Sequence, residues 1–163
     1  MPHHLHPWPQ SYHSAHNFFA PNPLHLHILA VKHLTWWLTP FGVFHMNSLS
    51  DFFPPHLITM CCCLLSKSVV PVTLSNYATG LFRFSQFCDD YNIPKAFCMP
   101  ASEALVTMYI TCHGTASISA STMQHWLLGL ELCHEIHSAP WLGHSNLKWA
   151  VKVMMVILSL CTD

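Results

Sequence analysis

Charged side chains are scarce in this sequence. Lysine, arginine, aspartate and glutamate together make up 8% of its 163 residues, whereas a typical soluble domain carries about 25%. The net charge is −1 when histidine is neutral, so the chain as a whole has no strong attraction for nucleic acids or anionic lipids. Hydrophobic residues make up 52% of the chain, and we therefore expect apolar patches on its surface.

Three sequence patterns are also missing. No apolar run reaches the ~18 to 20 residues that a membrane-spanning helix needs, and the N-terminus has no basic and apolar leader of the secretory type. None of the eight cysteines belongs to a CxxC pair. We therefore predict no membrane span, and a nuclear or cytoplasmic location in which a reducing environment keeps the thiols free.

The composition changes near residue 67. Residues 1–66 hold ten of the 15 histidines and most of the 12 prolines, but only two charged residues, Lys32 and Asp51. Each proline removes an amide donor and restricts the residue before it. We therefore predict an irregular His/Pro-rich segment over residues 1–66, without a stable core of its own, and an apolar tail over residues 153–163.

Helical periodicity begins near Val72. Thr73 or Ser75 is a candidate N-cap for a first helix, and Asn92 and Pro94 are expected to end it. Apolar residues recur along this stretch at steps of 4, 3, 4 and 3, which is the spacing of one helical face: Tyr77, Leu81, Phe84, Cys88 and Tyr91.

Three more helices are predicted after the first. The second covers residues 102–113 with Ser102 as its cap, the third covers residues 121–137, and a fourth begins near Ser145. Four helices with short connections predict an all-α four-helix bundle over residues 68–152. The predicted core residues are Leu81, Phe84, Leu105, Tyr109, Trp126, Leu127 and Leu130.

An ordered set of motifs runs through this region. It includes residues 73–77 (TLSNY), 80–89 (GLFRFSQFCD) and 99–105 (MPASEAL), followed by WL at 126–127 and APW at 139–141. This set resembles the N-terminal core-binding domain of tyrosine recombinases of the phage-integrase type, which has a SAM-like helical fold. The resemblance is closest to the tyrosine-recombinase-like proteins of fungal mobile elements.

The resemblance implies one half of a clamp around DNA. In that family a separate C-terminal domain carries the catalysis, with a cluster of Arg, Lys, His and Arg and a Tyr nucleophile. This sequence contains a single arginine, Arg83, and 11 residues follow Lys152. A site that needs two arginines cannot be built from one, so the transferred phosphate would lack its electrostatic clamp. We therefore predict a non-catalytic module that needs no cofactor and no small-molecule substrate.

Candidate phosphate contacts lie at the start of the third predicted helix, where amides and hydroxyls can hold an anion, although simple N-capping explains these hydroxyls equally well. Residues 68–152 carry four cationic and five acidic side chains, so any DNA binding should be weak and non-specific. The predicted DNA-binding residues are Arg83, Ser119, Ser121, Thr122, His125 and Lys148.

Histidine clusters near the N-terminus raise the question of a metal site. Residues 3, 4 and 6 are histidines, as are residues 25 and 27, and neutral imidazoles bind zinc or copper. A structural zinc site needs four convergent ligands at a set spacing. No such spacing occurs, and the contiguous cysteines 61–63 cannot easily converge on one ion. We predict no metal site beyond adventitious binding.

Three functions remain open at this stage. The chain can be a weak DNA-binding module that derives from a mobile-element recombinase. It can instead be a protein–protein interaction module in which the bundle and the apolar C-terminal tail dock on a partner through apolar surface. The low charge favours this alternative and the next one over a DNA-binding module. The third alternative is a truncated fragment without a selected function.

Overall fold

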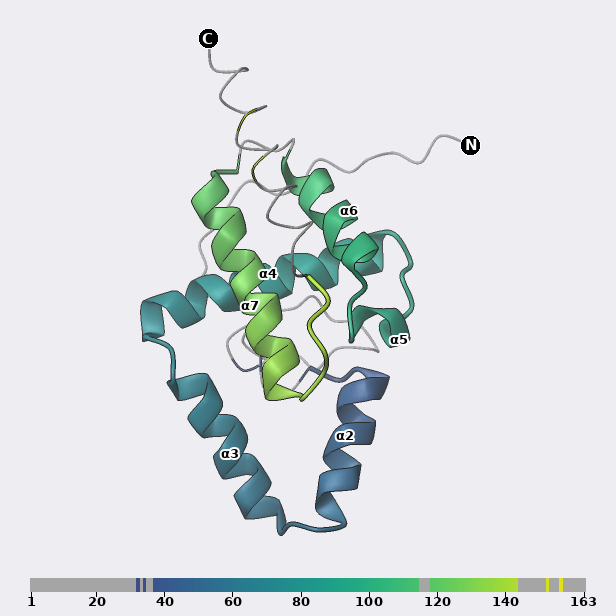
Figure 1. Ribbon diagram of the computed structural model, residues 1–163, viewed down its shortest axis with the longest axis vertical. Coiled ribbons are helices and arrows are strands. Elements are labelled where there is room, and N and C mark those ends of the chain that lie inside the picture. Colours follow the sequence, from purple (N-terminus) through teal and green to yellow (C-terminus); the bar gives the residue numbers. More distant parts are fainter. Residues whose placement is uncertain are drawn as a thin grey trace.

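The structure, a computed structural model, describes residues 32, 34, 37–114, 118–143, 152 and 156. Within these residues it is helical and contains no strand, so the predicted all-α class is confirmed. In Figure 1, four of the described helices form the body of the molecule, and the other two form a hairpin that points away from it. In chain order the described helices are α2 (Pro40–Ser50), α3 (Pro55–Lys67), α4 (Pro71–Asp90), α5 (Lys95–Cys98), α6 (Glu103–Gly114) and α7 (Ala120–Ile136).

Helix α4 lies at the centre of the body. All of its residues from Ala78 to Ser85 are buried, although the sequence predicted only one apolar face. The ring of Phe84 makes edge-to-face contacts with Tyr109 of α6, at 5.3 Å between ring centroids, and with Trp37, at 6.1 Å. Segments that precede and follow α4 in the sequence therefore cover it together, and an all-round burial of this kind is typical of a core helix.

The closest packing in the body is the crossing of α4 and α7, which Figure 1 shows near the middle of both helices. Gly80 lies directly against the backbone of Trp126, and Gly129 lies directly against the backbone of Tyr77. Each helix thus supplies an aromatic residue followed three positions later by a glycine, and the two pairs face each other reciprocally. Because glycine lacks a Cβ atom, it allows two backbones to approach this closely.

The predicted core is largely correct. Leu105 and Leu127 are only partly buried, but both pack against the main apolar cluster. The other five predicted core residues are buried in that cluster: Leu81, Phe84, Tyr109, Trp126 and Leu130.

The prediction of an irregular segment over residues 1–66 is wrong for its described part, which contains α2 and α3. Pro40, Pro55 and, in the next helix, Pro71 each stand at the first position of a helix. Proline loses no hydrogen bond there, since the first amides of a helix have no partner within it, and its fixed φ angle suits the helix. These prolines begin helices instead of interrupting them.

Residues from the same segment also enter the main core. The side chains of Leu34 and Trp37 are buried, and the carbonyl oxygen of Leu34 lies 3.5 Å from the Sγ atom of Cys133, which donates to it. The Thr39 Oγ1 atom accepts a hydrogen bond from the Gly42 amide at 3.1 Å and thereby caps α2. The core therefore includes residues from both sides of position 67.

Three of the four predicted helices are present, with small shifts at their ends. Helix α4 begins at Pro71, and no side chain caps it, so the N-cap predicted at Thr73 or Ser75 is wrong. Ser102 does cap α6, because its Oγ atom accepts from the Leu105 amide at 3.2 Å. Asn92 follows the end of α4 with a positive φ of 54°, which is a common way to end a helix.

The fourth predicted helix, near Ser145, lies outside the described residues. So does the predicted apolar tail over residues 153–163, apart from Val156. Of the four predicted helices, the structure therefore describes only the first three, which correspond to α4, α6 and α7.

Substitution of either crossing glycine by alanine should destabilise the protein. A Cβ atom on Gly80 or Gly129 would overlap the backbone of the opposite helix, and backbone cannot move aside as a side chain can. We expect Gly80→Ala to lower the free energy of unfolding by about 3 kcal/mol, as overpacking does. Urea unfolding of the full chain, followed by circular dichroism, measures this change.

The sign of the change in the free energy of unfolding distinguishes steric overlap at the helix crossing from an effect of helix propensity. Alanine in place of glycine normally stabilises a helix interior by about 1 kcal/mol. Ala104, which is exposed in the first turn of α6, provides the calibration, because Ala104→Gly changes only helix propensity and should cost at most about 1 kcal/mol. A Gly80→Ala protein as stable as the wild type would contradict the close crossing.

Candidate interaction surfaces

Four of the predicted DNA-binding residues come together at the start of α7. Ser119 is its N-cap, and the Ser119 Oγ atom accepts from the Thr122 amide at 3.2 Å. The same Oγ atom lies 3.1 Å from the hydroxyl of Ser121 and 2.8 Å from that of Thr122. The Nδ1 atom of His125 lies 2.8 Å from the carbonyl oxygen of Ser121. Helix capping thus uses the hydroxyl of Ser119, as the alternative interpretation of these residues predicted.

Arg83 does not belong to this surface. Its side chain is only 3% exposed, so the surface position expected for it is wrong. The Arg83 Nη1 atom donates to Gln86 Oε1 at 3.2 Å, and its Cζ atom lies 5.5 Å from the centre of the Phe82 ring. The reason is the position of α4, which is covered on all sides at this point. Lys148, the sixth predicted residue, lies outside the described residues.

The other cations of the described part form no basic face. Lys95 is 9% exposed and forms an ion pair with Asp89, with 2.8 Å between Nζ and Oδ1. Lys32, Lys67 and Lys152 are exposed, so three exposed lysines are the cations that the described residues can offer to phosphate. Phosphate neutralisation by the described residues is therefore weak.

Two histidines of the body, His134 and His113, are buried. The Nε2 atom of His134 accepts from the Ala101 amide at 2.9 Å, so the proton of the neutral ring resides on Nδ1, which donates to the Leu130 carbonyl oxygen at 2.8 Å. His113 donates from Nδ1 to the carbonyl oxygen of Tyr109 at 3.1 Å. Burial lowers the pKa of both rings to about 4, because the apolar surroundings disfavour the charged form.

Tyr109 lies beside His113, but the pair shows no feature of a nucleophile and its base. The Tyr109 hydroxyl donates to the carbonyl oxygen of Gly80 at 3.1 Å, and complete burial raises the pKa of this phenol well above 10. The Tyr109 ring packs at 4.7 Å from His113 and at 6.4 Å from Trp126, between centroids. The arrangement is that of a packed core with a satisfied hydroxyl group.

The described residues contain no group of three or more His, Cys, Asp or Glu side chains that could hold a metal ion. The three contiguous cysteines of α3 diverge, since Cys62 is buried whereas Cys61 and Cys63 are exposed. The histidines at positions 3, 4, 6, 25 and 27 lie outside the described part of the chain.

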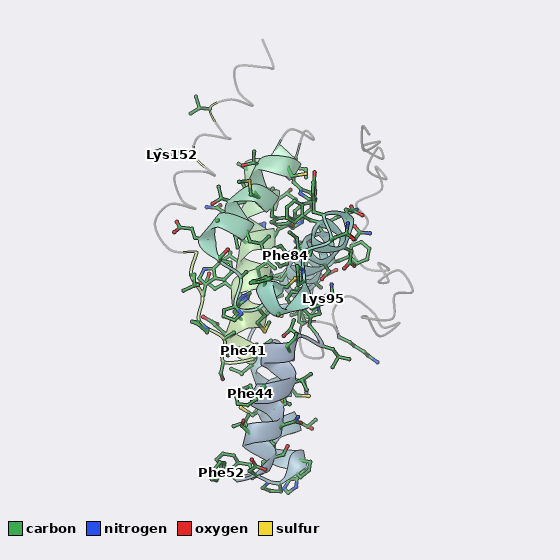
Figure 2. All side chains as sticks on the ribbon, turned by 90° about the vertical axis from the view of Figure 1, so that its right-hand side faces the viewer. Phe41, Phe44, Phe52, Phe84, Lys95 and Lys152 are labelled. Carbon is green, nitrogen blue, oxygen red and sulfur yellow. The ribbon has the colours of Figure 1, made fainter. Side chains whose placement is uncertain are left out.

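The most unusual surface belongs to the hairpin of α2 and α3, residues 40–67, which we call the apolar hairpin. Phe52, in the turn, is 82% exposed and Phe44 is 72% exposed. Figure 2 shows Phe52 at the far end of the hairpin, Phe44 halfway along it and Phe41 where it joins the body. The other exposed large apolar residues of the hairpin are Val43, Phe53, Leu57, Met60, Leu64 and Leu65.

Sequence reasoning missed this surface, although a signal was present. Residues 40–66 contain a single charged side chain, Asp51, but the prolines of this segment led to the prediction of irregular structure. An uncharged helix normally hides its apolar residues in a core. The apolar hairpin buries mainly Gly42, Ile58 and Cys62 and leaves the larger side chains outside.

No family model matches this sequence, and neither a curated protein nor a solved structure matches it. Among the described residues, no single helix has the length and apolar character to cross a membrane. Only α3 and α4 taken together, with a bend of 104° between them, meet that criterion.

Stability should fall in acid because of His134. Above its ordinary pKa of 6.5 the ring is neutral in both the folded and the unfolded chain, and its stabilising contribution is complete. Since the folded-state pKa is about 4, the unfolded chain binds the proton first, and stability is lost as the pH falls from 6.5 through 4. The loss for one such histidine is roughly 3 kcal/mol at pH 4. Thermal unfolding between pH 7 and pH 4 measures it.

Two variants isolate this contribution. His134→Gln removes one of two titrating groups, because burial lowers the pKa of His113 to about 4 as well, and it should therefore reduce the dependence of stability on pH by about half, even if it lowers stability at pH 7. His56, which is exposed on α3, is the control for the loss of an imidazole, and His56→Gln should leave the stability at pH 7 unchanged. Equal slopes in the wild type and in His134→Gln would show that His134 does not titrate as inferred.

Proposed function

We propose that the chain is a non-catalytic protein-interaction module and that the apolar hairpin is its binding element. The observation that carries the proposal is the concentration of large exposed apolar side chains on α2, α3 and their turn. Full burial of one such side chain stabilises a complex by about 1.5 to 3 kcal/mol. A few aromatic anchors of this kind usually dominate the affinity of an interface.

The attachment of the hairpin to the body supports the proposal. The Thr39 side chain caps α2 and also donates from its hydroxyl to the Met99 Sδ atom at 3.5 Å. Gly42 packs against the ring of His137, which follows the end of α7. Ile58 and Cys62 are the buried residues of α3. A surface held in this way loses little conformational entropy on binding, which favours affinity.

Site-specific photocrosslinking in cells tests this proposal. A photoreactive phenylalanine analogue in place of Phe44 should give a discrete covalent adduct with a partner chain. Phe97 of α5 is a matched control, because its exposed fraction of 65% is close to the 72% of Phe44 but it belongs to the body. Absence of an adduct at Phe44, or equal adducts at both positions, would contradict the proposal.

A second candidate function is weak, non-specific DNA binding, as the resemblance to recombinase core-binding domains implies. Its support is the grouping of Ser119, Ser121, Thr122 and His125 at the first turns of α7, where the helix dipole favours an anion. The buried position of Arg83 counts against it. The DNA candidate therefore rests on fewer cations than the sequence alone suggested.

Fluorescence anisotropy with a labelled duplex and the full chain tests this candidate. One or two phosphate contacts predict a dependence of log K on log salt with a slope of about −1 to −2, and a dissociation constant at or beyond ~10⁻⁴ M at physiological salt. Glu131→Arg on α7 should tighten binding, and Glu131→Gln, which only removes the acid, should give a smaller gain. Binding that is tight and independent of salt, or no binding in any variant at low salt, would refute it.

A further inference from the structure

Helix α3 carries an exposed stripe with the spacing of a helix–helix seam. Leu57, Met60, Leu64 and Lys67 follow one another at steps of 3, 4 and 3, and all four are exposed. The two buried residues of α3, Ile58 and Cys62, stand one position after Leu57 and two before Leu64. Steps of 3 and 4 keep side chains on one face of a helix, as in a coiled coil, so the stripe can receive a second helix along its length.

The charges at the two ends of this stripe are opposite. Lys67 closes the stripe at the last residue of α3, and Asp51 stands in the turn before α3 begins. Both side chains are exposed, and residues 52–66 between them carry no charge. In an antiparallel partner whose Leu64 lies near this Leu57, Lys67 lies opposite Pro54, at the turn that carries Asp51, so each Lys67 approaches the Asp51 of the other copy.

The stripe is also nearly symmetric about its middle. Met60 lies midway between Leu57 and Leu64 to within half a residue, so an antiparallel copy would set each Leu57 near the partner's Leu64 and the two Met60 side chains against each other. The distance from Leu57 to Lys67 is about 15 Å along the helix axis. Each patch would thus meet its own counterpart, as a twofold interface requires.

We propose that the apolar hairpin is a homodimer interface in which α3 packs antiparallel against α3 of a second copy of this chain. This inference rests on the proposed function, since it names the partner of the same surface. A hairpin from each copy then forms a four-helix arrangement, in which the exposed Phe44 and Val43 of α2 offer further apolar surface. A lipid bilayer is the poorer occupant, because insertion of the hairpin tip would carry the Asp51 carboxylate into hydrocarbon.

Charge reversal tests the antiparallel pairing. Analytical ultracentrifugation of the full chain should show a concentration-dependent dimer. Asp51→Lys alone and Lys67→Asp alone should each raise the dimer dissociation constant about tenfold, because each variant sets like charges opposite each other at both ends of the seam. The double variant Asp51→Lys with Lys67→Asp restores both pairs and should return the dissociation constant to within about twofold of the wild type.

Matched leucines test the seam itself. Leu57→Ser should abolish the dimer, and Leu128→Ser on α7 should leave it intact, although the two leucines are similarly exposed at 40% and 42%. Circular dichroism of each variant establishes that its helices are retained.

A chain that is monomeric at all concentrations overturns the inference. A double variant whose dimer dissociation constant is as high as those of the single variants overturns it as well. If the wild type is monomeric and Phe44 crosslinks to a different protein, the dimer is wrong and the proposed function stands. If Phe44 gives no adduct of any kind, both are wrong. Sedimentation of the wild-type chain with vesicles of phosphatidylcholine and phosphatidylserine, without a dimer in their absence, would identify the surface as membrane-binding instead.

Discussion

The close crossing of α4 and α7 is the contact on which the other packing in the body depends. Gly80 and Gly129 let the two helices approach until backbone meets backbone, and the aromatic residue three positions before each glycine fits against the partner. This crossing sets the position of Trp126, whose ring contacts Tyr109 and His113 of α6. Further along α7, His134 reaches the Ala101 amide. The crossing angle and separation therefore determine where α6 and the segment before it can pack.

The polar groups of the body bond to other groups of the body, some across helices and some within one helix. The Tyr109 hydroxyl bonds to a carbonyl of α4, and His134 bonds to the Ala101 amide and to its own helix. Arg83, the single arginine, packs on Phe82 and bonds to Gln86, and Lys95 pairs with Asp89. A chain with so few charged residues that buries two of its cations has little charge left for recognition. Its exposed apolar surface is then the more characteristic chemical feature.

The sequence predicted the body much better than the hairpin. Helices α4, α6 and α7 follow from the 3.6-residue period and from Ser102, because local spacing and capping decide them. The glycine crossing could not be predicted, since it depends on which two distant segments meet. Arg83 was misassigned because one apolar face was assumed for α4, whereas burial on all sides follows only from tertiary packing.

The error over residues 40–66 has a different origin. Proline ends a helix at an interior position and begins one at the first position, and the sequence alone does not show which applies. Pro40 and Pro55 are both preceded by residues in an extended conformation, Thr39 and Pro54, as a residue before proline prefers. The hairpin also exposes large apolar side chains that an isolated domain would bury. An interpretation that assigns apolar residues to a core therefore could not locate them on the surface. The feature of the sequence that could have indicated the apolar hairpin is its scarcity of charged residues.

The three helix-initiating prolines have a further consequence for the chain before it folds. A proline ring restricts its own φ angle in the unfolded state as well, so fewer disordered conformations compete with the native one, an effect of about 0.4 to 1 kcal/mol at a compatible site. Pro40 and Pro55 begin the two helices of the hairpin, which bury few large side chains, whereas Pro71 begins the core helix α4. Restriction of the disordered ensemble by Pro40 and Pro55 thus offsets part of what the hairpin lacks in packing.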